Sequence, residues 1–197
     1  MHKCLTEFRR RFERVEHGAN FLRVRACAFT EHSADGTEIA TRNLEFVETE
    51  QLGCNTVAVA LLARDASGTL AIGIDEDDLP AAQQFNGNSR LLVTPAWRVP
   101  GSMRTLTEAL SFVRTKLSEE FGIHVHEPLA LGGAYRPSAG LTPEIVFPFA
   151  FEVREIDSSK RELKWIDLRE LVNNRASLAD GHLRVLSARM GHALNLG

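Results

Sequence analysis

Cysteine is scarce in this chain of 197 residues: there are three, Cys4, Cys27 and Cys54, and they lie far apart. Such a set indicates a reducing compartment and argues against a disulfide framework or a zinc site. Long apolar runs are also missing, since the longest, Val57–Ala63, is far too short to cross a bilayer. The charged N-terminal residues lack the apolar core of a signal peptide. These absences predict a cytoplasmic protein without a membrane partner.

An excess of positive charge is missing too. The 23 Lys and Arg residues are outnumbered by 26 Asp and Glu residues, which gives a net charge of -3. Nucleic-acid binding needs a basic surface, so no nucleic-acid partner is expected. The sequence also has no His-Glu-x-x-His motif, and no serine or cysteine has the surroundings of a catalytic nucleophile. Two-histidine metal chemistry and nucleophilic catalysis are therefore not supported.

The N-terminal part of the chain contains a predicted helix and a predicted hairpin. Apolar residues at helical spacing predict a helix over Leu5–Val15. Alternating residues predict strands over Phe21–Thr30 and Thr37–Glu48, joined by a turn at Asp35-Gly36. Residues 1–52 are thus expected to form an N-terminal extension, and residues 53–197 the main domain. The helix is expected to pack on the domain, with partner binding as the alternative.

The main domain alternates between strand and helix patterns. The near-continuous apolar run at Asn55–Arg64 is typical of a strand buried on both faces. Further strands are predicted over Thr69–Ile74, Leu91–Val93, Pro128–Tyr135, Ile145–Val153 and Leu163–Leu168, and helices after Gly101 and over His182–Leu194. This alternation predicts an α/β/α sandwich in which helices cover both faces of a mixed sheet.

The stretch from Gly101 to Ile123 carries the main site signal. An apolar helix face is indicated by residues at spacings of four, three and four: Leu106, Leu110, Val113 and Leu117. Gly122 stands where a left-handed C-terminal cap is expected. Glu120 lies close to the apolar stripe, where a carboxylate costs free energy unless a metal or a neighbouring lysine pairs with it.

The same stretch resembles the signature of the Nudix hydrolases. That signature runs from a glycine through a glutamate, an Arg-Glu pair and a Glu-Glu pair to a second glycine. Gly101 and Gly122 fall on the two glycines, and Glu119 and Glu120 fall on the Glu-Glu pair. The resemblance covers about residues 55–194 and implies a Nudix-type sandwich. It also implies metal-dependent hydrolysis of a nucleoside diphosphate linked to another group, such as ADP-ribose or a nucleotide sugar.

Roles for the acidic residues follow from the resemblance. Glu119 and Glu120 would hold Mg²⁺ or Mn²⁺, with Glu108 as a weaker candidate ligand. The loop at residues 136–143 resembles one that precedes a late glutamate in Nudix enzymes that cleave ADP-ribose, and Glu144 falls near that position. Glu144 would position or deprotonate the attacking water. A solvated residue at the start of a strand is the alternative for Glu144.

Substrate contacts are expected from three further side chains. Trp97 could stack on a base, and Arg98 and Arg136 could bind phosphate oxygens. For Trp97 and Arg98, a core tryptophan and a solvated arginine are the alternatives. In the Nudix enzymes that cleave ADP-ribose, an N-terminal sheet often helps to build a dimer. The hairpin therefore predicts either a homodimer contact or a cover for the core of a monomer.

Three positions depart from the Nudix signature. Thr107 and Thr115 stand where the family has Glu and Arg, and Lys116 replaces a metal-binding Glu. Lys116 and Glu120 are four residues apart, so they can form an ion pair on one helix face, and this pair would compete with metal. Two hypotheses remain open: an active hydrolase, or a catalytically weak or inactive Nudix-fold module that binds a nucleotide-type ligand or a protein partner.

Overall fold

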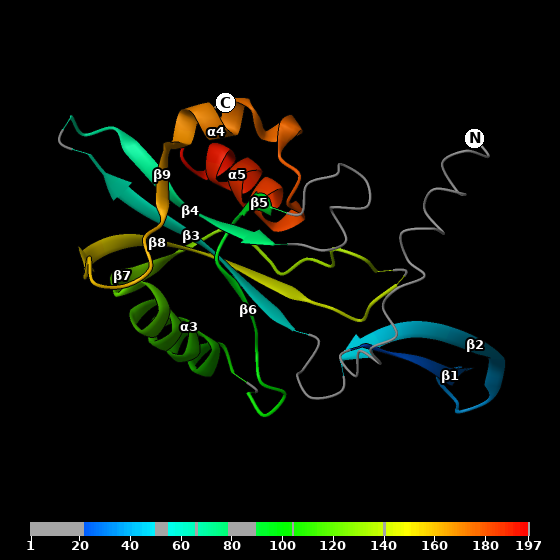
Figure 1. Ribbon diagram of the computed structural model, residues 1–197. Coiled ribbons are helices and arrows are strands. Elements are labelled where there is room, and N and C mark those ends of the chain that lie inside the picture. Colours follow the sequence, from blue (N-terminus) through cyan, green and yellow to red (C-terminus); the bar gives the residue numbers. More distant parts are fainter. Residues whose placement is uncertain are drawn as a thin grey trace, which may run out of the picture.

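The computed structural model describes residues 22–49, 55–65, 67–78, 90–103, 105–139 and 141–196 (Figure 1). Within these residues the main sheet has seven strands, five of them in the order β5-β4-β3-β8-β7, while β6 also pairs with β3 and β9 with β4. The strands are β3 (Thr56–Arg64), β4 (Leu70–Asp78), β5 (Arg90–Val93), β6 (Ala96–Arg98), β7 (Ile123–Ala130), β8 (Val146–Ile156) and β9 (Lys164–Asp167). Only β3 and β8 pair in parallel among the described strands. The predicted α/β class with a mixed sheet is confirmed.

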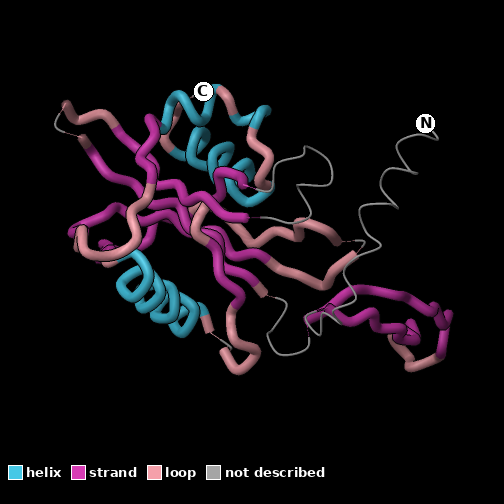
Figure 2. The backbone as a smooth tube through the Cα atoms, viewed as in Figure 1, coloured by secondary structure: helices cyan, strands magenta, loops and turns pink. Residues whose placement is uncertain are grey.

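Helices cover both faces of this sheet (Figure 2). Helix α3 (Leu106–Phe121) lies on one face, and α4 (Leu168–Asn173) and α5 (Gly181–Ala193) lie on the other. A short 3-10 helix, Arg175–Ser177, connects α4 and α5. The sequence predicted α3 and α5 but not α4.

Strand β3 is the centre of the core, and its residues from Thr56 to Leu62 are all buried, as predicted. Its side chains alternate between two apolar clusters. Val57, Val59 and Leu61 belong to the cluster under α3, and this side is called the α3 face. Ala58, Ala60 and Leu62 belong to the cluster under α4 and α5, and that side is called the α5 face.

Helix α3 has clear signals at both ends. Thr105 and Glu108 form a capping box at its start. Gly122 caps its end with φ of 63°, and a Cβ there would lie 2.8 Å from the Asp157 carbonyl oxygen, so both space and backbone favour glycine. The buried face differs from the predicted stripe, because Leu106 in the first turn is 58% exposed. The fully packed positions are Ala109, Val113, Leu117 and Phe121.

The N-terminal hairpin consists of β1 (Leu22–His32) and β2 (Glu38–Thr49), which pair antiparallel and stand apart from the main sheet in Figure 1. Hydrogen bonds from Ser33 and Thr37 within its turn lower the pKa of Asp35 to about 2. The backbone N–H of Val47 donates to the carbonyl of Leu141 at 2.8 Å, which ties β2 to the loop before β8. The predicted helix Leu5–Val15 and the predicted boundary at residue 52 lie outside the described residues.

Two strand predictions were wrong at their ends. The strand after α3 is Ile123–Ala130, not Pro128–Tyr135, because Gly132 turns the chain with φ of 82°. Strand β4 continues beyond Ile74 to Asp78, where its last residues pair with β5. In the described part of the chain, no helix is long and apolar enough to cross a membrane.

Candidate functional site

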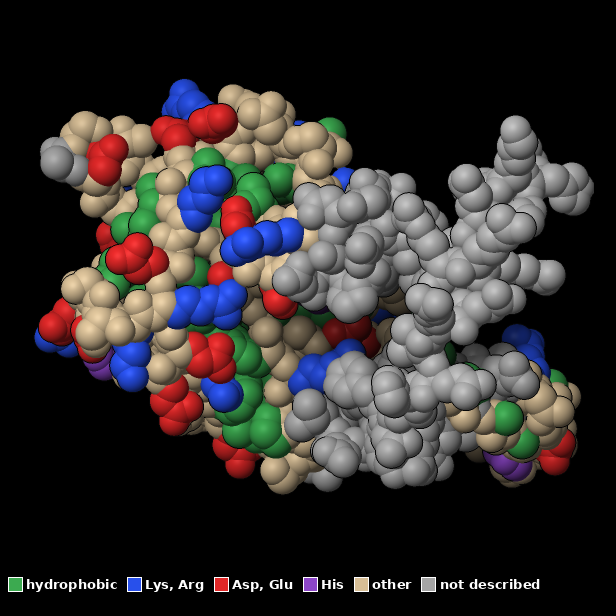
Figure 3. Space-filling model, in the orientation of Figure 1, with side chains coloured by type: hydrophobic (Ala, Val, Ile, Leu, Met, Phe, Trp, Pro, Cys, Tyr) green, Lys and Arg blue, Asp and Glu red, His purple; other side chains and the backbone are tan. Residues whose placement is uncertain are grey.

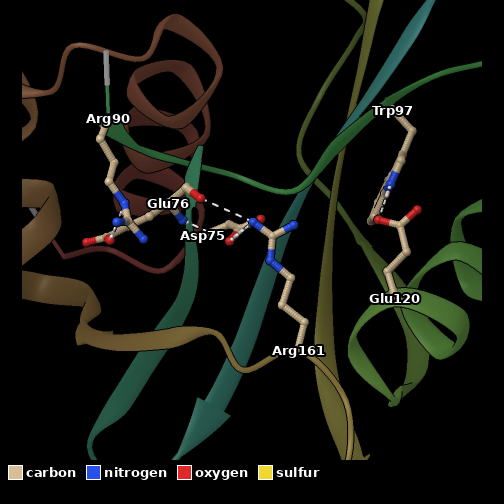
Figure 4. A network of polar contacts seen from close by, with 6 residues as sticks. All are labelled: Asp75, Glu76, Arg90, Trp97, Glu120 and Arg161. Atoms are coloured by element: carbon tan, nitrogen blue, oxygen red, sulfur yellow. Dashed lines mark hydrogen bonds and ion pairs between the residues drawn. The ribbon is translucent and has the colours of Figure 1, made fainter. Parts of the chain in front are cut away.

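Glu120, in the last turn of α3, has protein partners for both carboxylate oxygens. Its Oε1 lies 3.2 Å from the Nζ of Lys116, and its Oε2 accepts a hydrogen bond of 3.0 Å from the Nε1 of Trp97 on β6. Figure 4 shows the indole and the carboxylate pointing toward each other. The ion pair suggested by the four-residue spacing is therefore present.

The Glu120 carboxylate thus receives a positive charge from Lys116 and a hydrogen bond from Trp97, and neither contact requires a metal ion. An ammonium group has no lone pair with which to hold a cation, and it repels one. The side chains of Lys116 and Glu120 are 33% and 36% exposed, so water screens their attraction. Packing also supports the position of the Trp97 donor, because its ring contacts the ring of Phe121 edge-on, with the ring centres 6.3 Å apart.

Glu108, the weaker candidate ligand, lies far along α3 from Glu119 and Glu120. The carboxylate of Glu108 accepts from the backbone N–H and the hydroxyl of Thr105, at 2.8 and 2.9 Å, and so belongs to the helix cap. Glu119, which is exposed and adjacent to Glu120 in the sequence, lies eleven residues from Glu108, or about 16 Å along the helix axis. Among the residues that the structure describes, no group of three His, Cys, Asp or Glu could hold a metal ion. The predicted ligands of Mg²⁺ or Mn²⁺ are thus not gathered into one group of three in this part of the chain.

Glu144 lies on the opposite face of the sheet. Its Oε1 accepts a hydrogen bond of 2.5 Å from the Oγ1 of Thr56. Thr56 is two residues before Ala58 and shares its side of β3, which is the α5 face. Because Glu120 meets Trp97 on the α3 face, the sheet separates this predicted metal ligand from Glu144, the residue predicted to act on the water.

The residues predicted to contact a ligand also lie on different faces of the sheet. Trp97 pairs with Val57 in the sheet, so its half-buried ring belongs to the α3 face. Arg98 pairs with Thr56, which directs its half-buried side chain to the α5 face. Arg136 is exposed in the loop before β8, and Gly101 is exposed in the turn before α3. The structure thus brings Arg98 to the Glu144 side and Trp97 to the Glu120 side.

The loop that carries Arg136 and Glu144 is closed by backbone pairing. Tyr135 and Val146 exchange two hydrogen bonds, of 3.0 and 2.8 Å, across its ends. Within the loop the Ser138 carbonyl accepts from the N–H groups of Leu141 and Thr142. The composition of the sequence predicted this loop, and the structure shows that backbone hydrogen bonds hold its two ends together.

A polar cluster around Tyr135 was not predicted. The hydroxyl of Tyr135 lies 2.8 Å from the Nδ1 of His182 in the first turn of α5. The guanidinium of Arg189 stacks 5.3 Å from the Tyr135 ring centre and donates to the carbonyls of Leu131 and Gly133. Burial, followed by the charge of Asp180, raises the pKa of Tyr135 above its ordinary value. No local sequence pattern joins these residues, so sequence reasoning had no signal for the cluster.

A second network ties the loop before β9 to β4 (Figure 4). The Nη2 of Arg161 lies 2.8 Å from Asp75 and donates to the carbonyl of Glu76, while its guanidinium covers the ring of Phe121 at 5.7 Å. Burial raises the pKa of Asp75, and the nearby Arg161 opposes that shift. Glu76 also pairs with Arg90 at 3.2 Å. These contacts are structural ties, since each group has a protein partner.

No protein-family model matches the chain, and no curated protein matches it.

Proposed function

We propose that this chain is a Nudix-type α/β/α domain that binds a nucleotide-type ligand without metal-dependent hydrolysis. Support for the fold comes from helices on both faces of a mixed sheet and from a Gly101–Gly122 stretch that encloses α3. Support for the lack of hydrolysis comes mainly from one observation. Both oxygens of Glu120 already have partners, Lys116 and Trp97.

The ligand class is inferred from the arginines near Glu144. Guanidinium groups match the paired oxygens of phosphates, and Arg136 is exposed and makes no hydrogen bond or ion pair within the described part of the chain. Arg98 lies on the same side of the sheet. In Figure 3, basic and acidic side chains are interspersed on the face shown, without a broad basic surface. Such a surface suits a small phosphate-bearing ligand better than a nucleic acid.

Metal-dependent pyrophosphate hydrolysis is the competing function. It would require Lys116 to leave Glu120, so that Glu120 and the exposed Glu119 could hold Mg²⁺ together. It would also require the substrate to reach Glu144 on the other face of the sheet. Two observations favour it: Glu119 is exposed, and the side chains of the Lys116–Glu120 pair are about one-third exposed.

Calorimetric titration with Mg²⁺, Mn²⁺ and ADP-ribose, alone and together, tests the proposal. Binding of ADP-ribose that does not depend on metal is expected. Metal binding that tightens with the nucleotide, followed by cleavage of the pyrophosphate, would overturn the proposal in favour of the hydrolase. Binding of neither would remove the nucleotide ligand and direct the search to protein partners.

A charge reversal sharpens this test. We expect Lys116→Glu to raise the affinity for Mg²⁺, because it removes the competing ammonium and restores a carboxylate one helical turn from Glu120. Lys164→Glu is the matched control, since Lys164 is exposed on β9 and the charge change is the same. Equal Mg²⁺ affinity in the two variants would show that Lys116 does not block metal binding.

The hairpin supports a homodimer as a further part of the proposal. Val24 on β1 is 72% exposed and Ile39 on β2 is 60% exposed, so apolar side chains of the hairpin face solvent in the single chain. Sedimentation equilibrium of the protein and of a Val24→Ser variant measures this contact. A monomer at all concentrations would show that the hairpin serves another purpose.

A further inference from the structure

A hollow of about 320 Å³ lies where α3 meets the edge of the sheet at β7 and β8. It is lined by Arg114 from α3, by Ile123, His124 and Val125 from β7, and by Arg154 and Glu155 from β8. This hollow, called the Arg154 hollow, has the size of a small-molecule site. Arg114 and Lys116 are two residues apart, about 200° around α3, so the hollow lies away from the Lys116–Glu120 pair.

The two strands are locally irregular at the hollow. His124 pairs with Glu155 and Val125 pairs with Val153, which leaves Arg154 as an extra residue in β8. A bulge of this kind changes the direction of side chains and occurs often beside functional sites. Arg154 is exposed, and within the described residues it has no hydrogen bond or ion pair.

The second arginine of the hollow, Arg114, is paired with a carboxylate that can be displaced at a small cost in free energy. The Nη2 of Arg114 lies 2.9 Å from the Oε1 of Glu127, whose side chain is 87% exposed. An ion pair this open to water contributes little stability, so an incoming anion can replace Glu127. Glu155 is the one carboxylate among the lining residues, so with Glu127 displaced the two guanidinium groups leave one positive charge in excess.

The hollow also has an apolar side. Ile123 is 2% exposed and Val125 is half-buried, and both belong to the cluster under α3. Two guanidinium groups bind oxyanions in a planar, paired geometry, and a neighbouring apolar surface favours a ligand with an apolar body.

We propose that the Arg154 hollow binds a small molecule in which an oxyanion group, phosphate or carboxylate, is attached to an apolar body. The oxyanion pairs with Arg154 and Arg114, and the apolar body covers the half-buried Val125. The site is independent of the ligand proposed near Glu144, because it rests on different residues at another part of the sheet.

Nuclear magnetic resonance titration of the full chain tests this site with three probes: inorganic phosphate, phenyl phosphate and benzoate. Saturable shifts of the amide signals of Ile123, Val125 and Arg154 are expected with at least one aromatic probe. Phenyl phosphate binding more tightly than benzoate assigns a phosphate ligand, and the reverse order assigns a carboxylate. Absence of saturable shifts with all three probes overturns the proposal.

Variants separate this site from general attraction to arginines. Arg154→Gln is expected to weaken binding about tenfold or more, the loss that follows from removing one charged hydrogen bond. Arg114→Gln should also weaken it. Arg169→Gln is the matched control, since Arg169 is exposed on α4 and distant in sequence from the hollow, and it should leave binding unchanged. Equal affinity in the Arg154→Gln and Arg169→Gln variants overturns the proposal, and circular dichroism verifies that each variant is folded.

Discussion

On the α3 face of the sheet the carboxylate of Glu120 is held partly by charge, through the Lys116 ammonium at 3.2 Å. On the α5 face the carboxylate of Glu144 is held by a neutral hydroxyl, the Oγ1 of Thr56 at 2.5 Å. The first pair is about one-third exposed, whereas Thr56 is 5% exposed. Burial strengthens a hydrogen bond and water screens an ion pair, so the two faces should respond differently to substitution, salt and pH.

This difference bears on function. In the Nudix signature the glutamates at the end of the helix are the metal ligands, and here Glu120 at the corresponding position is paired with Lys116. On the α5 face, Glu144 accepts from Thr56, and Arg98 from β6 lies on the same side of the sheet. Four predictions test the contrast between the two faces.

The largest effect on stability is expected at Gly122, the cap at the end of α3. Gly122→Ala should lower the free energy of unfolding by about 3 kcal/mol, because φ of 63° costs a side chain about 1 kcal/mol or more and its Cβ would lie 2.8 Å from the Asp157 carbonyl. Gly68→Ala is the matched control, with φ of 85° and open space around it, and should lose about 1 kcal/mol. Urea denaturation measures both. Equal losses would show that the close approach to Asp157 is relieved at no cost.

The next largest effect is expected at the partly buried hydrogen bond between Thr56 and Glu144 on the α5 face. Thr56→Val keeps the shape of the side chain but leaves Glu144 without its donor, and should cost about 2 kcal/mol, the range for hydrogen bonds to charged groups. Thr94→Val is the control, because Thr94 is equally buried and donates to a neutral acceptor, the carbonyl of Val59. Its loss should be about 1 kcal/mol. A smaller loss for Thr56→Val than for Thr94→Val would contradict the importance of the Glu144 contact.

Sequence reasoning found the elements of both faces but not the contacts that distinguish them. The run at Asn55–Arg64 and the cap at Gly122 are local patterns, and the structure confirms both. The partners of Trp97–Glu120, Tyr135–His182 and Thr56–Glu144 are 23, 47 and 88 residues apart in the sequence. Such pairs depend on sheet register, which no local pattern determines. Register also placed Glu144 across the sheet from Glu120, where the Nudix signature suggested one shared site.

A third prediction uses the only tyrosine in the sequence, Tyr135. Its folded-state pKa is raised, so its contribution to stability is complete below the ordinary tyrosine pKa of about 10 and is lost as pH rises through that value toward the folded one. Tyr135→Phe should cost about 1 kcal/mol at neutral pH, since it removes the hydrogen bond with His182.

The same variant should lose less stability than the parent as the pH rises further. Chemical denaturation across this range gives the difference between the two proteins, and lysine titration cancels in that difference. Ultraviolet absorbance of the parent reports the ionisation of its single tyrosine directly. Ionisation of the folded protein at the ordinary tyrosine pKa would show that the ring is not shielded by the α5 face.

The smallest effect is expected at the ion pair itself. Glu120→Gln keeps an oxygen to accept from Trp97 and loses only the charge that faces Lys116, so it should change stability by about 0.5 kcal/mol. Added salt should reduce even this difference, because the pair is open to water, whereas the cost of Thr56→Val should not depend on salt. Urea denaturation at low and high ionic strength measures both quantities. A loss of several kcal/mol for Glu120→Gln would mean that Glu120 is a structural anchor of α3. In that case Lys116 could not leave it for a metal ion without unfolding the end of the helix.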